Sequence, residues 1–506
     1  MLFKNHSSIG FIMKNHEEEL LQARLIPPVQ KLELTAEEDY ALKMDCKVVV
    51  LCPLKEGVSQ KIILNAFQNY WKITPSFSAF YSKDVFPKDG YHIEISASEL
   101  KISAADSNGL FNALKTLRQL AEAKRGQMLT TEYILPQVRI QDAPATAFRG
   151  IHLCWFPETP LFEIEKQIRL AAYYKFNYVV LESWGMIKLK SHPEFCWSEF
   201  AVEPCEIERL VQLGHELGVT LCPQVNIFGH ASMSRCGTGK HALLDFNPEY
   251  QSLFEPDGWT WCLSNPHTRQ FLTDIVLEIF ELYHCPPYFH MGCDEAYNAG
   301  SCSACRKANY AALLKEHLVY FHDLFAARNT RVMMWHDMLL VQGDPRWKGY
   351  IVCGHKEDGL ENLYQELPKD IIIGDWQYGY PEIDGKEPDW TTMKFFQKNG
   401  YDVLACPWTN IKGLSSLGKL VKSEKLFGIL ETTWHMNRGM YMKTCFVESA
   451  RACWNPMAVM VDGVVDREFF NRHIREIGWD MKLTKYIEVG STQYQVNPTN
   501  YQGQGF

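Results

Sequence analysis

From about residue 148 onward, short apolar runs alternate along the chain with longer amphipathic stretches. Apolar runs of this length are typical of buried strands, and apolar residues spaced three and four apart are typical of helices. Their regular alternation favours a parallel sheet covered by helices, and eight such strands predict a (β/α)8 barrel. The expected strands are residues 148–155, 178–183, 219–226, 288–293, 331–338, 371–378, 402–408 and 427–434.

The first part of the chain has a different pattern, with a few strand-like runs and one clear amphipathic helix. A boundary is expected near Ala143 and Pro144, where the strand-like pattern ends in prolines. The sequence therefore predicts an α/β protein with a small α+β domain over residues 1–145. A barrel with a C-terminal extension is expected over residues 146–506. The elements expected in the small domain are strands 47–54, 90–96 and 100–104 and a helix over 109–123.

The composition of the chain gives no indication of a nucleic-acid or membrane partner. The chain has 506 residues, a formal net charge of −9 and a pI near 6.0, so no basic surface for nucleic acid is implied. No apolar stretch is long enough to span a bilayer, and the first residues lack a signal-peptide pattern. The 16 cysteines lie singly in apolar runs, which favours free thiols in a reducing compartment. We expect a cytoplasmic protein with no membrane partner, for which a homo-oligomer is compatible with the sequence.

The expected strand 288–293 is followed by two adjacent acids, Asp294 and Glu295. Adjacent residues on a strand point to opposite sides, so the two carboxylates can take different roles. Ligands bind at the carboxyl ends of barrel strands, where this pair is expected to lie. A solvated turn or a salt bridge is the alternative for an isolated pair of acids. The apolar strand before the pair, and Gly292 within it, favour a site.

Polar and aromatic residues are expected at the same end of the other barrel strands. Aromatic faces stack on the apolar faces of sugar rings, while carboxylates accept hydrogen bonds from hydroxyls. The pattern therefore predicts a sugar site. Besides the two acids, its candidate residues are Arg149, Glu182, His230, His290, Trp335, Asp337, Trp376, Tyr378, Trp408 and Trp434.

Several segments together resemble glycoside hydrolase family 20, the β-N-acetylhexosaminidases. Residues 290–295, HMGCDE, are similar to the family's His-x-Gly-Gly-Asp-Glu, with Cys293 in place of the second glycine. Residues 224–231, QVNIFGHA, resemble its Pro-Gly-His segment, and residues 333–338, MMWHDM, resemble its tryptophan-bearing fifth strand. Residues 109–150 are similar to the end of the family's first domain and its first barrel strand. The resemblance covers nearly the whole chain.

The chain also departs from the commonest family pattern. Cys154 and Pro157 stand where an aspartate and an arginine are usual, and Gln224 and Asn226 replace two acids before Gly229-His230. The second strand has no paired aspartates, which removes the usual partner of His230. No Tyr-x-Asp follows strand seven. These differences resemble the hexosaminidase D branch of the family.

The resemblance implies a retaining exo-β-N-acetylhexosaminidase that acts on glycans with terminal GlcNAc or GalNAc. By this resemblance, Asp294 holds the 2-acetamido group and Glu295 protonates the leaving oxygen. The acetamide oxygen then attacks the sugar and forms an oxazolinium intermediate. Two alternatives remain open: a hydrolase of the same fold acting on a modified amino sugar, and a catalytically silent sugar-binding protein. Retention of both acids favours an enzyme.

The other roles follow from the same resemblance. Arg149 would bind sugar hydroxyls, unless it pairs with a barrel acid instead. His230 would orient Glu295, and Glu182 would hold the far ring nitrogen of His230; a core histidine satisfied by backbone is the alternative. His290 is expected to brace the strand rather than touch substrate.

Aromatic residues would enclose the acetamide group. Trp335, Trp376 and Trp434 are the candidates for a cage around its methyl and for the floor beneath the ring, although any one of them alone fits a core position equally well. Asp337, Tyr378 and Trp408 are weaker candidates for contacts to the sugar or its acetamide.

No cofactor or metal is required by this chemistry. Cys302 and Cys305 have metal-ligand spacing, but a structural zinc site normally needs four ligands, so we expect free thiols there. We also expect GalNAc to be cleaved at a rate comparable to or above that of GlcNAc. Met436 stands where the family usually has a glutamate for the outer hydroxyls, and such a loss weakens selection between sugars.

Overall fold

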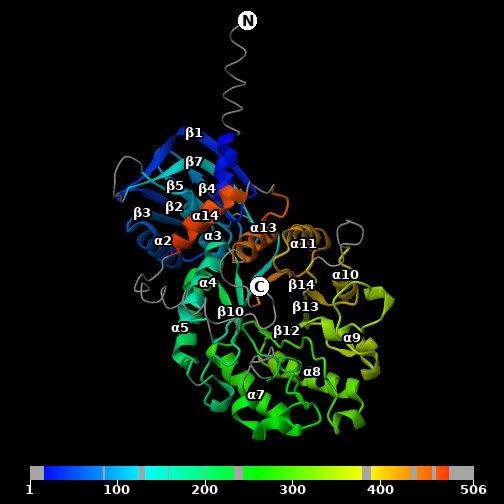
Figure 1. Cartoon of the computed structure of the whole chain (residues 1–506). Coiled ribbons are helices and arrows are strands. Elements are labelled where there is room, and N and C mark those ends of the chain that lie inside the picture. Colours follow the sequence, from blue (N-terminus) through cyan, green and yellow to red (C-terminus); the bar gives the residue numbers. More distant parts are fainter. Residues whose placement is uncertain are drawn as a thin grey trace. The chain divides into compact units, whose positions relative to one another are not determined.

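The computed structural model describes residues 16–83, 86–124, 132–157, 159–197, 199–232, 243–378, 389–434, 442–458 and 463–477 (Figure 1). Contacts divide the chain into two compact units. Of the described residues, the first unit contains those up to residue 147, residues 172–175 and those from residue 450 on; the second contains those of 148–171 and 176–449. The division into domains 1–145 and 146–506 stays a prediction. Met436, which entered the expected sugar preference, lies outside the described residues.

The first unit is built on one sheet with the strand order β1-β7-β4-β5-β2-β3, and β6 pairs with β7. The helix α3 begins where Asp106 Oδ1 accepts a hydrogen bond from the N–H of Gly109 at 2.8 Å, a capping contact typical of helix starts. Its leucines are buried in the core of this unit. The elements are β1 Lys31–Leu42, β2 Lys47–Cys52, α2 Glu56–Trp71, β3 Ser76–Tyr81, β4 Tyr91–Ile95, β5 Leu100–Ala104, α3 Ser107–Leu120, β6 Glu122–Ala123, β7 Tyr133–Asp142 and α14 Gly463–Glu476.

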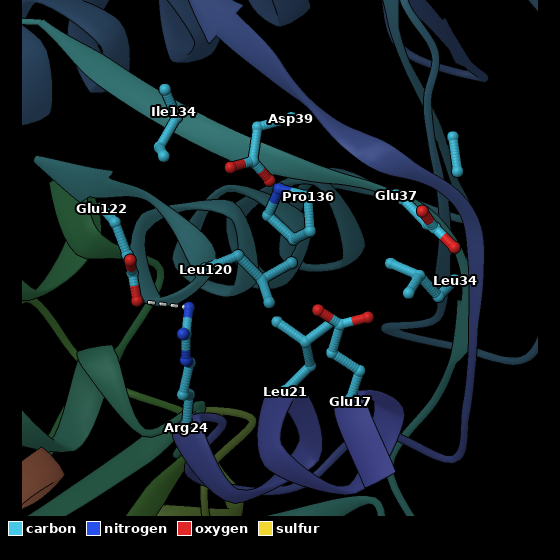
Figure 2. Close-up of a pocket in the computed structure, with 11 residues that line it drawn as sticks. Glu17, Leu21, Arg24, Leu34, Glu37, Asp39, Leu120, Glu122, Ile134 and Pro136 are labelled. Atoms are coloured by element: carbon cyan, nitrogen blue, oxygen red, sulfur yellow. Dashed lines mark ion pairs between the residues drawn. The ribbon is translucent and has the colours of Figure 1, made fainter. Parts of the chain in front are cut away.

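A surface hollow in the first unit lies beside β1 (Figure 2). Arg24 and Glu122 form an ion pair there at 2.5 Å. Burial raises the pKa of the nearby Asp39 carboxyl, and the charge of Glu122 raises it further. Both apolar and charged side chains line the hollow, with Leu21 beside these charged groups, and the lining residues include no nucleophile or histidine. We therefore assign no chemistry to this hollow.

The second unit contains a closed barrel of eight parallel strands in the order β8 to β15. This confirms the predicted (β/α)8 fold. The strands are β8 Phe148–Cys154, β9 Tyr178–Glu182, β10 Thr220–Gln224, β11 Tyr288–His290, β12 Arg331–Trp335, β13 Ile372–Asp375, β14 Asp402–Ala405 and β15 Gly428–Thr432. The helices of the unit are α4 Leu161–Tyr173, α5 Pro204–Leu217, α6 Leu243–Phe246, α7 Pro266–Leu282, α8 Tyr310–Ala326, α9 Leu363–Glu366, α10 Thr391–Lys398 and α11 Ile411–Glu424. A π-helical turn, Thr444–Glu448, precedes α13 Ser449–Trp454, which belongs to the first unit from residue 450 on.

Strand register places the carboxyl ends of neighbouring strands side by side. Cys154 pairs with Glu182, Glu182 pairs with Gln224, and Gln224 pairs with His290. The segments that follow these residues therefore leave the barrel at the same end, where catalytic groups of such barrels are found. Among the described residues, no helix is both long and apolar enough to cross a membrane.

Candidate active site

Asp294 and Glu295 lie just beyond the carboxyl end of β11, which ends at His290. Gly292, Cys293 and Glu295 all have positive φ, at 68°, 76° and 49°. Left-handed backbone is unfavourable for the two non-glycine residues, so the surrounding contacts must hold it in place. Asp294 is buried, whereas the side chain of Glu295 is 29% exposed. Of the two acids, Glu295 is therefore the one open to an approaching ligand.

Two glycines allow this turn to pack against the segment after β10. A Cβ at Gly292 would lie 1.9 Å from Oδ1 of Asn226, and a Cβ at Gly229 would lie 1.9 Å from the carbonyl oxygen of Asp294. A side chain at Gly229 would therefore displace backbone, and one at Gly292 would displace the Asn226 side chain and strain a left-handed residue. The close packing brings the residue after Gly229, His230, to the two acids.

His230 contacts both carboxylates with one ring nitrogen. Its Nε2 lies 3.3 Å from Oδ2 of Asp294 and 3.2 Å from Oε2 of Glu295. His230 also has a positive φ, 53°, and its ring packs on Trp259 with a centroid distance of 4.3 Å. The expected closeness of His230 to Glu295 is therefore found in the structure. An imidazole in this position can exchange a proton or a hydrogen bond with either acid.

Asp337 supports the acidic turn from the segment after β12. Its Oδ2 accepts a hydrogen bond from the backbone N–H of Glu295 at 2.8 Å, and its Oδ1 accepts one from Nε1 of Trp376 at 3.2 Å. The carboxyl is fully buried. Burial raises the pKa of Asp337 to about 8, and the charge of Asp294 adds to this effect. Burial thus favours the protonated form of Asp337.

The predicted aromatic residues meet at the carboxyl ends of β12 to β15. Trp434 Nε1 donates a hydrogen bond to the hydroxyl of Tyr378 at 2.7 Å, and the rings of Trp335 and Trp434 lie 5.5 Å apart. Tyr378 in turn lies 5.7 Å from Trp376 and 5.3 Å from Trp408. Burial, chiefly, raises the pKa of the Tyr378 hydroxyl well above its usual range, so it stays protonated. The structure thus gathers all five aromatic candidates into one group.

Trp335 is fully buried, so within this group it packs against other side chains and presents no surface to solvent. His290 packs against it with a ring distance of 4.2 Å, and Nδ1 of His290 accepts a hydrogen bond from the N–H of Gly292 at 3.0 Å. His290 itself is fully buried. These contacts favour a bracing role for His290, which stays a prediction.

Glu182 contacts His152, a histidine that the sequence pattern did not single out, and its expected contact with His230 stays a prediction. Its Oε2 lies 3.3 Å from Nε2 of His152 and 3.4 Å from Sγ of Cys154, and its Oε1 accepts a hydrogen bond from Nδ2 of Asn226 at 2.7 Å. His152, Cys154 and Glu182 are buried. Glu182 therefore belongs to a buried polar cluster, and its bond to Asn226 links that cluster to Gly292 in the acidic turn, against which Asn226 packs.

The position of Arg149 on β8 does not favour a contact with the acidic turn. Its neighbour Phe148 belongs to a core cluster to which most of the barrel strands contribute, so that cluster lies inside the barrel. Alternation along β8 directs the buried Arg149 to the opposite face, toward the helices. Arg149 also lies near the start of β8, about 16 Å along the strand from Cys154. This placement gives no support to a contact between Arg149 and a sugar.

Two further residues at the turn were missed in the sequence. Trp259 Nε1 donates a hydrogen bond to the carbonyl oxygen of Glu295, and the Tyr297 ring stacks on Trp259 at 6.3 Å. Burial, followed by the charge of Glu295, raises the pKa of the Tyr297 hydroxyl. Both residues lie in irregular segments, where no periodic pattern marks them. The nearness of Tyr297 to the acids in sequence was the only available signal.

This arrangement suits acid–base chemistry on a bound sugar. A buried carboxylate, a more exposed carboxyl and an imidazole lie within contact of one another, with a group of aromatic side chains at the same end of the barrel. Ligand atoms of His230, Asp294 and Glu295, and of His152, Cys154 and Glu182, also lie close enough to hold a cation. Their mutual contacts account for both groups without one.

Two family models match the chain. Residues 22–143 match domain 2 of glycosyl hydrolase family 20, and residues 183–409 match the catalytic domain of the same family. Together the two models match well over half of the chain.

Curated relatives match at lower coverage. A β-hexosaminidase of Vibrio furnissii is 24% identical over 387 residues, which cover 69% of this chain and 61% of that protein. Hexosaminidase D of Bos taurus is 26% identical over 174 residues, which cover 32% of this chain and 47% of that protein. The chain thus spans less than two thirds of the length of these relatives.

Solved structures share the fold. An exo-β-N-acetylglucosaminidase from Vibrio harveyi, in complex with N-acetylglucosamine, has a TM-score of 0.66 at 16% identity and covers 90% of this chain and 78% of that one. A chitobiase from Flavobacterium johnsoniae has a TM-score of 0.67 at 17% identity, with 91% and 73% covered. At these identities the likeness shows the fold alone.

Proposed function

Because the chain belongs to glycoside hydrolase family 20, we propose that it is a retaining exo-β-N-acetylhexosaminidase that releases terminal β-linked GlcNAc or GalNAc from glycans. The observation that carries the proposal is the contact of one His230 nitrogen with both Asp294 and Glu295 at the carboxyl end of β11. Curated relatives named as β-hexosaminidases support the same activity.

In the proposed reaction the substrate's own acetamide is the nucleophile. Its carbonyl oxygen forms a bond to C1 while the bond from C1 to the leaving oxygen breaks, and Glu295 transfers its proton to that oxygen. The exposure of Glu295 suits this role, because its carboxyl must reach a leaving group. Water then opens the oxazolinium at C1 and gives its proton to Glu295. Retention follows from the two displacements.

Asp294 is proposed to hold the acetamide. A buried carboxylate accepts the acetamide N–H and stabilises the positive charge that develops on the ring of the intermediate. The raised pKa of Asp337 supports this role, because a neutral Asp337 places no second buried negative charge next to the Asp294 carboxylate. His230 is proposed as the residue that orients both acids.

The aromatic group is proposed to enclose the acetamide methyl and the apolar ring face. Trp376 and Trp434 are the candidates for direct contact, because each keeps some exposed surface whereas Trp335 is fully buried. The hydrogen bond from Trp434 to Tyr378 fixes the relative position of two of these rings. A preformed wall of this kind binds the sugar without losing much side-chain freedom.

A panel of nitrophenyl glycosides tests the proposal. The two β-N-acetylhexosaminides should be hydrolysed, and the β-glucoside and β-galactoside should not, because these lack the acetamide nucleophile. Equal turnover of all four would contradict the substrate-assisted mechanism. Binding of N-acetylhexosamine without turnover of any glycoside would instead establish a silent sugar-binding protein.

We also propose a cytoplasmic location. All 15 cysteines of the described residues are free, and most of them are buried. Thiol titration of the denatured protein, with and without prior reduction, should count close to all 16 cysteines in both samples. A large rise after reduction would reveal disulfides and contradict the location.

A further inference from the structure

A second cluster of ionisable side chains lies next to the acidic turn and takes no part in the proposed reaction. Ligand atoms of Glu255, Cys262, Cys302 and Cys305 all lie within 4.8 Å of one another. Cys262, Cys305 and Glu255 are buried, and Cys302 is partly buried. The sequence showed only the spacing of Cys302 and Cys305; the fold supplies the other two residues from a separate loop.

We propose that these four residues bind a structural zinc ion. The distances from Sγ of Cys262 are 3.7 Å to Sγ of Cys302 and 3.8 Å to Sγ of Cys305. A tetrahedral site with Zn–S bonds of about 2.3 Å separates its sulfurs by about 3.8 Å. A disulfide would instead place two sulfurs about 2.05 Å apart. The sulfurs therefore have the spacing of ligands around one ion.

Glu255 supplies an independent observation. Its side chain is fully buried, and its Oε1 accepts no hydrogen bond from the described residues. A buried carboxylate oxygen without a donor is costly, and a metal ion would satisfy it. The other oxygen, Oε2, accepts hydrogen bonds from the backbone N–H of Cys302 and from the hydroxyl of Ser301, at 2.5 Å and 3.2 Å. These bonds fix the carboxylate beside the thiols.

Polar groups around the thiols suit the thiolate form. The backbone N–H of Cys305 donates to Sγ of Cys302 at 3.3 Å, and the hydroxyl of Ser264 lies 3.1 Å from Sγ of Cys305. On zinc binding, the three thiols would lose their protons to solvent, and these donors would stabilise the resulting negative charge. Three thiolates and one carboxylate complete four-coordination, so the site is closed and leaves no position for substrate. Soft sulfur ligands favour zinc over magnesium or calcium.

The ion would tie two segments together at the acidic turn. Glu255 and Cys262 belong to a hairpin in which Phe254 pairs with Trp261, whereas Cys302 and Cys305 follow the two acids in sequence. Trp259 lies near the tip of that hairpin and donates to the carbonyl oxygen of Glu295. Zinc would therefore hold the Trp259 hairpin against the turn that carries Glu295.

Metal analysis of the purified full-length chain, expressed with zinc in the medium, tests the proposal. Elemental analysis should find close to one zinc per chain. Cys305→Ser and Glu255→Gln should lower the zinc content several-fold, and Cys205→Ser, which changes an exposed cysteine of α5, should leave it unchanged. Zinc below one tenth per chain in the wild type, another metal in its place, or full zinc in Cys305→Ser would overturn the assignment.

A second measurement does not depend on the variants folding. Wild-type protein loaded with Co2+ should show visible d–d bands of tetrahedral cobalt and a near-ultraviolet thiolate-to-cobalt charge-transfer band. Removal of the metal should lower the thermal midpoint of the wild type and leave that of Cys305→Ser nearly unchanged. Absence of the charge-transfer band would contradict thiolate ligation. These measurements require no glycosidase activity, so they stand apart from the proposed function.

Discussion

The backbone N–H of Glu295 donates a hydrogen bond of 2.8 Å to the buried carboxyl of Asp337. This bond fixes the left-handed backbone that presents Glu295, and it links the end of β11 to the segment after β12. Because Asp337 also accepts from Trp376, one carboxyl sets the positions of both an acid and an aromatic side chain.

Asp337 should make stability depend on pH. Its pKa is about 8 in the folded protein and near 3.9 in the unfolded chain, so folding takes up a proton between these values. The stabilisation is fully present below pH 4 and is lost as the pH rises through 8. Urea unfolding of wild type and Asp337→Asn from pH 5 to 9 should show the wild type losing stability relative to the variant. A difference that stays constant across this range would contradict the raised pKa.

Replacement of His230 by glutamine should lower kcat/KM for an N-acetylhexosaminide by about 100-fold, since both acids lose their common contact and a small misplacement of a catalytic group is costly. Most of the loss should appear in kcat. His322→Gln is the matched control, because this histidine pairs with Asp323 and Asp370, whose side chains are exposed, away from the site. A kcat and KM equal to those of the wild type in His230→Gln would contradict a role of His230 in orienting the two acids.

GalNAc should be cleaved at a rate comparable to or above that of GlcNAc. No Tyr-x-Asp follows strand seven and Met436 replaces a usual glutamate, so fewer acceptors distinguish axial from equatorial O4. Competition between the two nitrophenyl substrates gives the ratio of kcat/KM directly. A strong preference for GlcNAc would show that other residues select the sugar.

Fluorination of the substrate's N-acyl group should slow turnover steeply. Each fluorine withdraws electron density from the carbonyl oxygen, which must attack C1 if the acetamide is the nucleophile. Rates for the acetyl, fluoroacetyl, difluoroacetyl and trifluoroacetyl glycosides should therefore fall progressively. A thiazoline mimic of the intermediate should bind much more tightly than substrate. Similar rates for all four glycosides would indicate a protein nucleophile instead.

Much of the fold could be predicted, because a buried barrel strand can be recognised from a short run of consecutive apolar residues. The end of β11 was placed three residues late, at Cys293, because positive φ at Gly292 and Cys293 ends the strand while the side chains stay apolar. Arg149 shows a second limit. Its sequence position suggested the site, but alternation with Phe148 directs it outward.

Contacts between distant segments were beyond prediction from the sequence. Cys262 precedes Cys302 by 40 residues, and no repeat or spacing connects them. Trp259 likewise reaches Glu295 from an irregular hairpin. Pairing of Glu182 with His152 follows from the register of two adjacent strands, which composition does not fix. Such contacts depend on tertiary packing, and only the structure shows them.

Asp294 and Glu295 are proposed as the catalytic groups of this site. The most direct test of this proposal is the kcat/KM of wild type, Asp294→Asn and Glu295→Gln on an unactivated N-acetylhexosaminide and on an activated aryl glycoside. Glu295→Gln should lower kcat/KM at least about 100-fold on the unactivated substrate. The loss should be much smaller on the aryl glycoside, because its leaving group departs without needing a proton. Asp294→Asn should lower kcat/KM on both substrates, because the acetamide must be oriented whichever leaving group departs. Unchanged activity of both variants on the unactivated substrate would contradict the account.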